Sequence, residues 1–264
     1  MNLTVGFELE FAPIGKICPD CRGRGYKDIS VFNYRTYRQS CETCRGERFI
    51  NKVEFRNDTP TVGGKFKSDT SVVTNRNYIG MEFASKVLKS WSEVEQSVDY
   101  ILHIIKENGA MSNASRMCGL HIHTKPIGGW KKRSLITLIE NWIDWGEDFF
   151  LDEFKTSQKR LIYCSKWSDL EKKEIKETLL KVKNKSLALI LIFRLLSSRY
   201  KTLNLRALNK HKTVEFRLFN GSVQKSRIIK ALDYTIKFVE SLENKDPYNS
   251  FMDKIDKINK VVTA

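Results

Sequence analysis

The chain of 264 residues lacks any apolar run long enough to span a membrane. Its longest run, Leu187 to Leu196, is interrupted by Arg194 and is shorter than the roughly 18 residues that a span requires. The N-terminus has no basic stretch followed by an apolar segment, which a secretory signal would show. The sequence therefore predicts a cytoplasmic protein, in the host cytoplasm if the protein is viral, with no membrane partner.

Several familiar catalytic motifs are also missing. A phosphate-binding loop of the form GxxxxGK[ST] does not occur, and Gly63-Gly64-Lys65 does not fit it. We find no arrangement of Ser, His and Asp, or of Cys and His, that is typical of a nucleophilic enzyme. Internal repeats and low-complexity linkers are absent as well. These absences argue against a P-loop ATPase and against an enzyme that forms a covalent intermediate on a side chain.

Acidic residues are outnumbered, 31 against 46 lysines and arginines, which gives a formal net charge of +15. Such a charge favours anionic partners, such as nucleic acid, nucleotides or an acidic surface. Much of the excess lies in helical stretches such as Glu171 to Lys185, where a solvated helix face is the usual explanation. Charge alone therefore does not favour nucleic acid as the partner. The small size and the basic charge would also suit a phage or mobile-element protein.

Four of the six cysteines form two Cys-x-x-Cys pairs, separated by 19 residues. The pairs are Cys18 with Cys21 and Cys41 with Cys44. Two residues between ligands let a tight turn aim both sulfurs at one ion, so the spacing predicts a structural Zn²⁺ site with four thiolates. The alternative, two disulfides, requires an oxidising compartment, which the missing secretory signal does not support.

The cysteine-containing segments CPDCRGRGY and CETCRGERF resemble the zinc-binding repeats of J-domain co-chaperones, although only half of that module is present. We expect a zinc-knuckle insert at residues 16–50, within a catalytic domain made of residues 1–15 and 51–264. An insert of about 35 residues is too short to build its own core, so the metal would stabilise it. The remaining cysteines, Cys118 and Cys164, are expected in the core.

Alternating and helical patterns divide the rest of the chain into strands and helices. Period-2 alternation predicts strands at residues 3–11, 78–84, 119–123, 202–208 and 213–219. Helical spacing predicts helices at residues 92–108, 133–154, 168–198 (broken near Asn184) and 226–242, while residues 51–77 are expected to be irregular. Because there is no βαβ rhythm, this mixture indicates an α+β fold, with an antiparallel-rich sheet and helices on one face.

The polar sides of the predicted strands carry the informative residues, since residues two apart on a strand point the same way. Five strands present acidic, imidazole or guanidinium groups opposite an apolar face: Glu8 with Glu10, Glu82, His121 with His123, Asn204 with Arg206, and Glu215 with Arg217. Taken singly, a Glu-x-Glu pair is usually solvated and a His-x-His pair is often structural. Their joint occurrence is what indicates a site.

If these strands form one sheet, its polar face gathers at least four carboxylates, two imidazoles and two guanidinium groups. So many acids would repel one another unless cations neutralised them. Carboxylate oxygens suit Mg²⁺ or Mn²⁺, and arginines beside such ions typically bind phosphate oxygens. The residues alone therefore predict a divalent-metal and phosphate site on a sheet face.

Four motifs, in this order, resemble those of the amidoligases, which are carboxylate–amine ligases related to glutamine synthetase and glutamate–cysteine ligase. They are GFELEF (6–11), SDTSV with GMEFAS (68–72 and 80–85), CGLHIHT (118–124) and NLRALNKHKTVEFRLFNGS (204–222). The resemblance covers nearly the whole chain outside the predicted insert. It implies a glutamine-synthetase-like antiparallel sheet whose concave face holds ATP and two or three Mg²⁺ ions.

The resemblance also implies roles for the polar residues. The implied Mg²⁺ ligands are Glu8, Glu10, Glu82, His123 and Glu215, with His121 as the other candidate for the metal- or phosphate-facing histidine. The implied catalytic set is Glu8, Glu10, Glu215 and Arg217, of which Arg217 would steady the transferring phosphoryl group. The residues implied to contact nucleotide or substrate are His121, His123, Asn204, Arg206 and Arg217.

The implied reaction is a two-step ligation whose partners are ATP, a carboxylate and an amine, each from a small molecule, a peptide or a protein. ATP transfers its γ-phosphoryl group to the carboxylate, and the amine then attacks the acyl phosphate and leaves an amide. Two alternatives stay open. One is a non-catalytic, zinc-containing module that binds nucleic acid or protein. The other is a metal-dependent hydrolase that uses Glu8, Glu10, His121 and His123.

Overall fold

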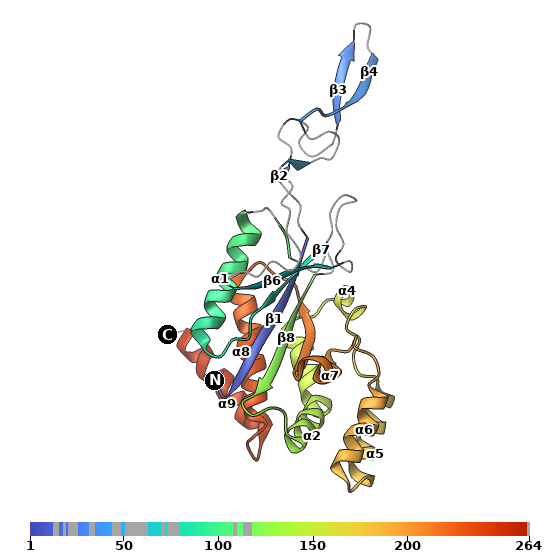
Figure 1. Cartoon of the computed structure of the whole chain (residues 1–264), viewed down its shortest axis with the longest axis vertical. Helices are drawn as coiled ribbons and strands as arrows, with labels where there is room; N and C mark the ends of the chain where they lie inside the picture. The colour runs from blue at the N-terminus through green and yellow to red at the C-terminus, as the bar shows by residue number, and fades with distance from the viewer. Residues whose placement is uncertain are drawn as a thin grey trace.

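The computed structural model describes residues 1–12, 16–17, 20, 26–31, 35–43, 49–50, 63–69, 72, 80–107, 110–112 and 118–262. Its main element is a six-stranded antiparallel sheet with the strand order β6-β7-β1-β8-β10-β9 (Figure 1). The first strand of the chain therefore lies inside the sheet, between β7 and β8. The strands of this sheet are β1 (Leu3–Phe11), β6 (Gly64–Asp69), β7 (Gly80–Ser85), β8 (Gly119–Pro126), β9 (Leu203–Asn204) and β10 (Val214–Asn220).

Helices make up most of the remaining described chain. They are α1 (Trp91–Glu107), α2 (Lys132–Asn141), the π-helical turn η2 (Trp142–Gly146), α3 (Glu147–Glu153), α4 (Gln158–Leu161), α5 (Asp169–Lys181), α6 (Lys185–Leu195), α7 (Ala207–His211), α8 (Lys225–Ser241) and α9 (Pro247–Val262). Among the helices described, none has the length and apolar character that crossing a membrane requires.

One face of the sheet is apolar and lies in the hydrophobic core. Alternation along β1 sends Phe7, Leu9 and Phe11 to this face, and each is at most 1% exposed. Helices α1 and α8 pack against it (Figure 1). Trp142 of η2 packs edge-on against Phe216 of β10, with ring centroids 5.5 Å apart. Because burying one such side chain stabilises the fold by about 1.5–3 kcal/mol, this face anchors the sheet and leaves the other for polar groups.

Most of the predicted elements are confirmed. Strands β1, β7, β8 and β10 lie where alternation predicts them. The break near Asn184 separates α5 from α6, and the Asn184 side chain accepts hydrogen bonds from the first turn of α6. The helical stretch from α2 to α3 also follows the prediction, although it contains the π-helical turn η2. Cys118 and Cys164 are both buried in the core as expected.

Three expectations are wrong. Part of the segment expected to be irregular forms the edge strand β6. The strand predicted at residues 202–208 is limited to β9, because Asn204 Oδ1 accepts a hydrogen bond from the Arg206 N–H at 2.9 Å and the chain turns into α7. Arg206 therefore does not share a strand face with Asn204. Nor do all helices lie on one face, since residues of α4 and α7 border the polar side of the sheet.

A bulge in β10 shapes the edge of the polar face. Phe216 pairs with Ile122 and Phe219 pairs with Leu120, so β10 carries one more residue than β8 between these positions. The Arg217 N–H donates instead to Thr202 O at 2.8 Å. The bulge thereby separates the Arg217 backbone from β8. The Arg217 carbonyl accepts a hydrogen bond from Arg160, which lies outside the sheet.

Within the predicted insert, the structure describes two small antiparallel pairs. They are β2 (Lys16–Ile17) with β5 (Phe49–Ile50), and β3 (Tyr26–Val31) with β4 (Arg35–Ser40). The β3–β4 hairpin stands apart from the main sheet in Figure 1. Cys41 is buried, whereas Cys18, Cys21 and Cys44 lie outside the described residues. The zinc site and the domain division therefore stay predictions.

Candidate active site

The polar face of the sheet brings the predicted site residues into cross-strand contact. Because antiparallel partners lie directly opposite one another, their side chains on one face are neighbours. The opposed pairs are Glu10–Glu82, Glu8–His121, His123–Glu215 and Glu215–Asn204. Four glutamates from three strands thus meet on this face, and we call Glu8, Glu10, Glu82 and Glu215 the acidic cluster.

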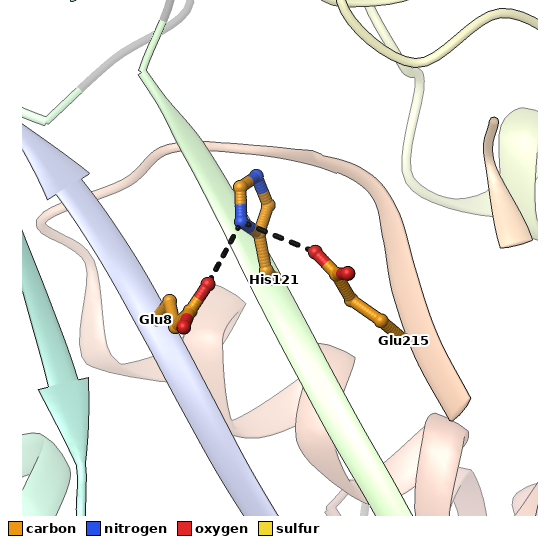
Figure 2. Close-up of side chains that lie close together, drawn as sticks. All are labelled: Glu8, His121 and Glu215. Atoms are coloured by element: carbon orange, nitrogen blue, oxygen red, sulfur yellow. Dashed lines mark hydrogen bonds and ion pairs between the residues drawn. The ribbon is translucent and has the colours of Figure 1, made fainter. Parts of the chain in front are cut away.

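His121 lies at the centre of the acidic cluster. Its Nδ1 is 3.3 Å from Glu8 Oε2 and 3.5 Å from Glu215 Oε1, so that carboxylates of β1 and β10 converge on one ring nitrogen (Figure 2). Its Nε2 is 3.2 Å from Glu10 Oε1. The imidazole side chain is only 2% exposed. One buried imidazole therefore connects three of the four glutamates.

Both carboxylate oxygens of Glu10 have partners. Oε2 is contacted by two N–H donors, and Oε1 lies near His121. The Gly119 N–H donates to Glu10 Oε2 at 2.5 Å, and Arg160 NH1 of α4 lies 3.3 Å from the same oxygen. Glu10 is 3% exposed. Since a buried carboxylate without partners is strongly destabilising, these contacts explain how Glu10 is accommodated in the sheet.

Lys67 of β6 faces the acidic cluster from the edge of the sheet. Its Nζ lies 3.2 Å from Glu82 Oε1 and 3.6 Å from Glu8 Oε1. The Lys67 side chain is 44% exposed, so its ammonium group is also accessible from the cavity that the cluster borders. Lysine is common on edge strands, where its charge discourages pairing with other chains. Here the contacts show that Lys67 also neutralises part of the negative charge of Glu8 and Glu82.

Arg217 and Asn204 hold Glu215 from both sides. Arg217 NH1 donates to Glu215 Oε1 at 2.5 Å, and Asn204 Nδ2 donates to Oε2 at 2.6 Å. The Arg217 side chain is 13% exposed, and its Nε has no hydrogen-bond partner among the described residues. A guanidinium that lines the cavity and is fixed to Glu215 through one nitrogen is suited to grip an anionic group beside Glu215.

These side chains line one cavity of about 710 Å³, within the size range of ligand pockets. His123 borders it with its Nδ1 bonded to Thr213 Oγ1 at 3.0 Å. The His123 Nε2 is buried 3.6 Å from Glu8 Oε2, and in the described part of the chain no group forms a hydrogen bond with it. Arg206 borders the same cavity at the start of α7.

Histidines and an arginine control the ionisation of two acids in the cluster. Burial alone would raise the pKa of Glu8, but the hydrogen bond with His121 and the charges of His121 and His123 outweigh burial and hold this pKa well below its usual range. Burial would also raise the pKa of Glu215, whereas the charges of Arg217 and both histidines lower it. Both carboxylates are therefore ionised at neutral pH and able to bind a cation.

Glu82 has the opposite shift. Burial and the negative charges of Glu8 and Glu10 raise the pKa of Glu82 from 4.5 to about 7, although Lys67 opposes this shift. The ionised form of Glu82 is therefore less favourable in the folded protein than in water. A cation bound nearby would remove the penalty.

Replacing Glu82 with glutamine is expected to stabilise the metal-free protein at pH 8 and to have little effect at pH 4.5. The raised pKa means that the folded protein favours protonated Glu82, so its stability contribution is fully present below pH 4.5 and is lost as the pH rises through about 7. Glutamine mimics the protonated form at every pH. We expect a gain on the order of 1–3 kcal/mol at pH 8, measured by thermal unfolding in EDTA.

Glu177→Gln is the matched control for Glu82→Gln. It removes the same charge from α5, where the carboxylate forms an exposed i,i+4 pair with Lys181, and such pairs contribute little. Its unfolding temperature should match the wild type at both pH values. A Glu82→Gln variant that unfolds at a lower temperature than the wild type at pH 8 would show that Lys67 stabilises Glu82 by more than burial destabilises it.

Three protein cations neutralise much of the acidic cluster. They are Lys67, Arg160 and Arg217, which lie within ion-pair distance of its carboxylates. The acids can therefore come together without a metal ion. Crowded acids alone therefore do not require metal ions here, and metal binding is inferred from the geometry of the donors.

That geometry fits divalent cations. One donor atom each from Glu8, His121 and Glu215 lie within 4.8 Å of one another, and so do donor atoms from Glu10, Glu82 and His121. Carboxylate oxygens suit Mg²⁺ or Mn²⁺, and the imidazole nitrogen adds a ligand that transition-metal ions prefer. The raised pKa of Glu82 is consistent with a place for a cation beside it.

The structure gathers all the predicted residues of the polar face around one cavity, with Arg206 reaching it from α7 and not from a strand. It also adds Lys67 and Arg160, which the sequence reasoning missed. Alternation in GKFKSD, the sequence of β6, is a signal that could have placed Lys67 on the polar face. Arg160 has no such signal, since its contact with Glu10 joins residues 150 positions apart.

The family model described as "Putative amidoligase enzyme" matches residues 1–239. This match includes all six strands of the main sheet and every residue of the acidic cluster. No curated protein matches the chain.

Proposed function

Because the chain belongs to the amidoligase family, we propose that it is an ATP- and Mg²⁺-dependent carboxylate–amine ligase with a glutamine-synthetase-like sheet. The observation that carries the proposal is the convergence of Glu8, His121 and Glu215 from three strands, beside Arg217, in one cavity. A binding scaffold gains nothing from acids crowded on one face, whereas a ligase needs them to hold cations beside a phosphate-binding arginine.

We assign one Mg²⁺ or Mn²⁺ site to Glu8, His121 and Glu215, and a second to Glu10 and Glu82. Metal ions there would neutralise the repulsion between the substrate carboxylate and the ATP phosphates. The assignment prefers His121 as the imidazole ligand, since its Nδ1 faces both Glu8 and Glu215.

His123, which the sequence favoured as a ligand, is assigned to the anionic phosphate groups instead. Its Nδ1 is taken by Thr213, its buried Nε2 lies 3.6 Å from Glu8 Oε2, and its side chain borders the cavity. Interaction with Glu8 and Glu215 raises the pKa of His123 despite the opposing effect of burial. A histidine that is more readily protonated suits a phosphate oxygen better than a metal ion.

Arg217 is assigned to the transferring phosphoryl group. Glu215 fixes its NH1, which orients the guanidinium and leaves its Nε unpaired. A positive charge held in this way stabilises the charge that develops during transfer without having to reorganise. Asn204 supports the arrangement by holding the other oxygen of Glu215. Arg206, which also lines the cavity, is assigned to the nucleotide or the substrate.

The proposed reaction requires no nucleophilic side chain. An oxygen of the substrate carboxylate attacks the γ-phosphorus of ATP, the bond to the bridging oxygen breaks, and ADP and an acyl phosphate form. The amine nitrogen then attacks the acyl carbon, the carbon–oxygen bond to phosphate breaks, and phosphate leaves. The nitrogen loses a proton and the amide remains. The chain's residues bind, orient and neutralise charge throughout.

The test is a turnover assay. The protein is incubated with ATP, Mg²⁺ and mixtures of amino acids or peptides, and the release of ADP and phosphate is measured. Release that depends on both a carboxylate and an amine, and that is lost in Glu8→Ala and Arg217→Ala, supports the ligase. No turnover with any such pair, together with salt-sensitive binding of nucleic acid, would favour a non-catalytic module.

We also propose that Cys18, Cys21, Cys41 and Cys44 hold a structural Zn²⁺ in the insert, on the basis of their spacing. The double variant Cys18→Ser, Cys41→Ser is expected to lose its zinc, because two thiolates cannot close a tetrahedral site. The measurement is metal content by mass spectrometry, with the wild type expected to hold about one zinc per chain. A double variant with the full zinc content would refute the site.

A further inference from the structure

Arg160 is a buried arginine that contacts three strands of the sheet from outside it. Its Nε donates to Arg217 O at 3.0 Å, its NH1 lies 3.3 Å from Glu10 Oε2, and its NH2 contacts His121 Nε2. The side chain is 2% exposed. Since burial of an arginine requires that its charge and its N–H groups find partners, this position is determined by the site around it.

The surrounding chain is built to place this guanidinium. A Cβ atom added at Gly119 would lie 2.1 Å from Arg160 Cζ, so a larger residue would displace the arginine. The segment before Arg160 is tied to the end of β10: Thr156 Oγ1 donates to Leu218 O, and Ser157 Oγ donates to Asn220 Oδ1 at 2.9 Å. The Ser157 hydroxyl oxygen also accepts the Arg160 N–H at 3.1 Å.

We propose that Arg160 is a positioning residue for the metal ions of the proposed ligase, and this inference rests on that function. His121 belongs to both groups of donors that could hold a metal ion, and Glu10 belongs to one. Arg160 contacts Glu10 Oε2, and it reaches His121 at Nε2, whereas Glu8 and Glu215 lie at the other ring nitrogen, Nδ1. Arg160 therefore holds Glu10 against the sheet. Glu10 Oε1, 3.2 Å from His121 Nε2, can in turn accept the Nε2–H that the ring carries when Nδ1 binds an ion, so the donor atoms are in place before any ion binds.

The charge of Arg160 and its positioning have opposite consequences for metal binding. A guanidinium near a divalent cation repels it, so removal of the charge alone would strengthen binding. Loss of an outer contact that orients a metal ligand typically weakens metal affinity 10–100-fold. The sign of the change in affinity therefore separates the two roles.

The experiment is a titration of the whole chain with Mn²⁺ alone, in which electron paramagnetic resonance reports free and bound ion. We expect Arg160→Gln to weaken Mn²⁺ binding by about 10–100-fold and to change the line shape of the bound ion. Arg160→Lys should not rescue binding, because an ammonium cannot contact three strands at once. Arg160→Gln with wild-type or tighter affinity would overturn the inference.

Two further variants keep the test decisive. Arg199→Gln removes the same charge at the border of the same cavity, but its guanidinium contacts only Tyr200 among the described residues. Its Mn²⁺ affinity should stay within about twofold of the wild type. Gly119→Ala displaces the Arg160 guanidinium without deleting its charge, and we expect it to weaken Mn²⁺ binding as Arg160→Gln does.

If Arg160→Gln fails to fold, as judged by circular dichroism, Gly119→Ala decides the matter. Unchanged Mn²⁺ affinity in folded Gly119→Ala would overturn the inference. The proposed function has a separate failure: a wild-type chain that binds no Mn²⁺ would refute the ligase itself. Wild-type binding that survives both Arg160→Gln and Gly119→Ala would leave the ligase standing and remove only the role of Arg160.

Discussion

Replacing Glu8 with glutamine is expected to abolish ATP turnover and to weaken Mn²⁺ binding by more than about 100-fold. Glu8 Oε2 lies 3.3 Å from His121 Nδ1 and 3.6 Å from His123 Nε2, and Oε1 lies 3.6 Å from Lys67 Nζ. It is thus the one described carboxylate that contacts both histidines and the lysine. Its strongly lowered pKa means that it supplies a full negative charge at neutral pH, which glutamine cannot.

Two measurements check this prediction. Titration with Mn²⁺ reports the site directly and needs no substrate, and the ADP-release assay reports turnover with whichever carboxylate and amine the wild type uses. We expect turnover to fall by about 1,000-fold or more, which corresponds to roughly 4 kcal/mol of transition-state stabilisation. Glu177→Gln, the exposed control on α5, should behave as the wild type in both. Mn²⁺ affinity that is unchanged in Glu8→Gln would show that Glu8 is not a ligand.

The sequence predicts the central strands of this protein well, for a physical reason. Strand β1 is buried on one face only, so its side chains must alternate, and the alternation of Phe7 and Leu9 with Glu8 and Glu10 is visible without the structure. The same holds for β8 and β10. Since residues two apart share a face, the site could be predicted in outline from the polar residues of these strands alone.

The edges of the sheet could not be predicted in this way. Strand β6 buries little, and among its side chains only Phe66 is strongly apolar, so alternation is faint there. Strand β9 has two residues, because the Asn204 side chain turns the backbone just after it. Short edge strands are defined by their partners and not by their own pattern. The consequence is that Lys67 was missed and that Arg206 was placed on the wrong element.

Arg160 shows a different limit. Its role depends on a short helix, on a glycine that leaves room for it and on a bulge that frees a backbone carbonyl, and these features come from three separate segments of the chain. No pattern within a single segment carries this information. The polar side chains of the sheet can thus be predicted from the sequence, whereas the residues that position them are identified only from the three-dimensional structure.

Replacing Arg217 with lysine is the second prediction with a large effect, and it separates chemistry from metal binding. We expect kcat to fall by about 100–1,000-fold, while Mn²⁺ affinity stays within a few-fold of the wild type. Lysine keeps the positive charge, so Glu215 retains a counter-ion and the metal ligands stay in place. It has one ammonium group, however, which Glu215 would occupy, whereas the Arg217 guanidinium binds Glu215 through NH1 and still lines the cavity with the rest of its fork.

Arg199→Lys is the matched control, since it makes the same exchange at the border of the same cavity, where the guanidinium contacts only Tyr200 among the described residues. Its kcat should equal that of the wild type. Arg217→Lys with more than about one third of the wild-type kcat would show that charge alone suffices and that the fork of the guanidinium is not used. A parallel fall in kcat and in Mn²⁺ affinity would instead place the role of Arg217 in orienting Glu215. Only a fall in kcat with metal binding preserved fits an arginine that acts on the transferring group.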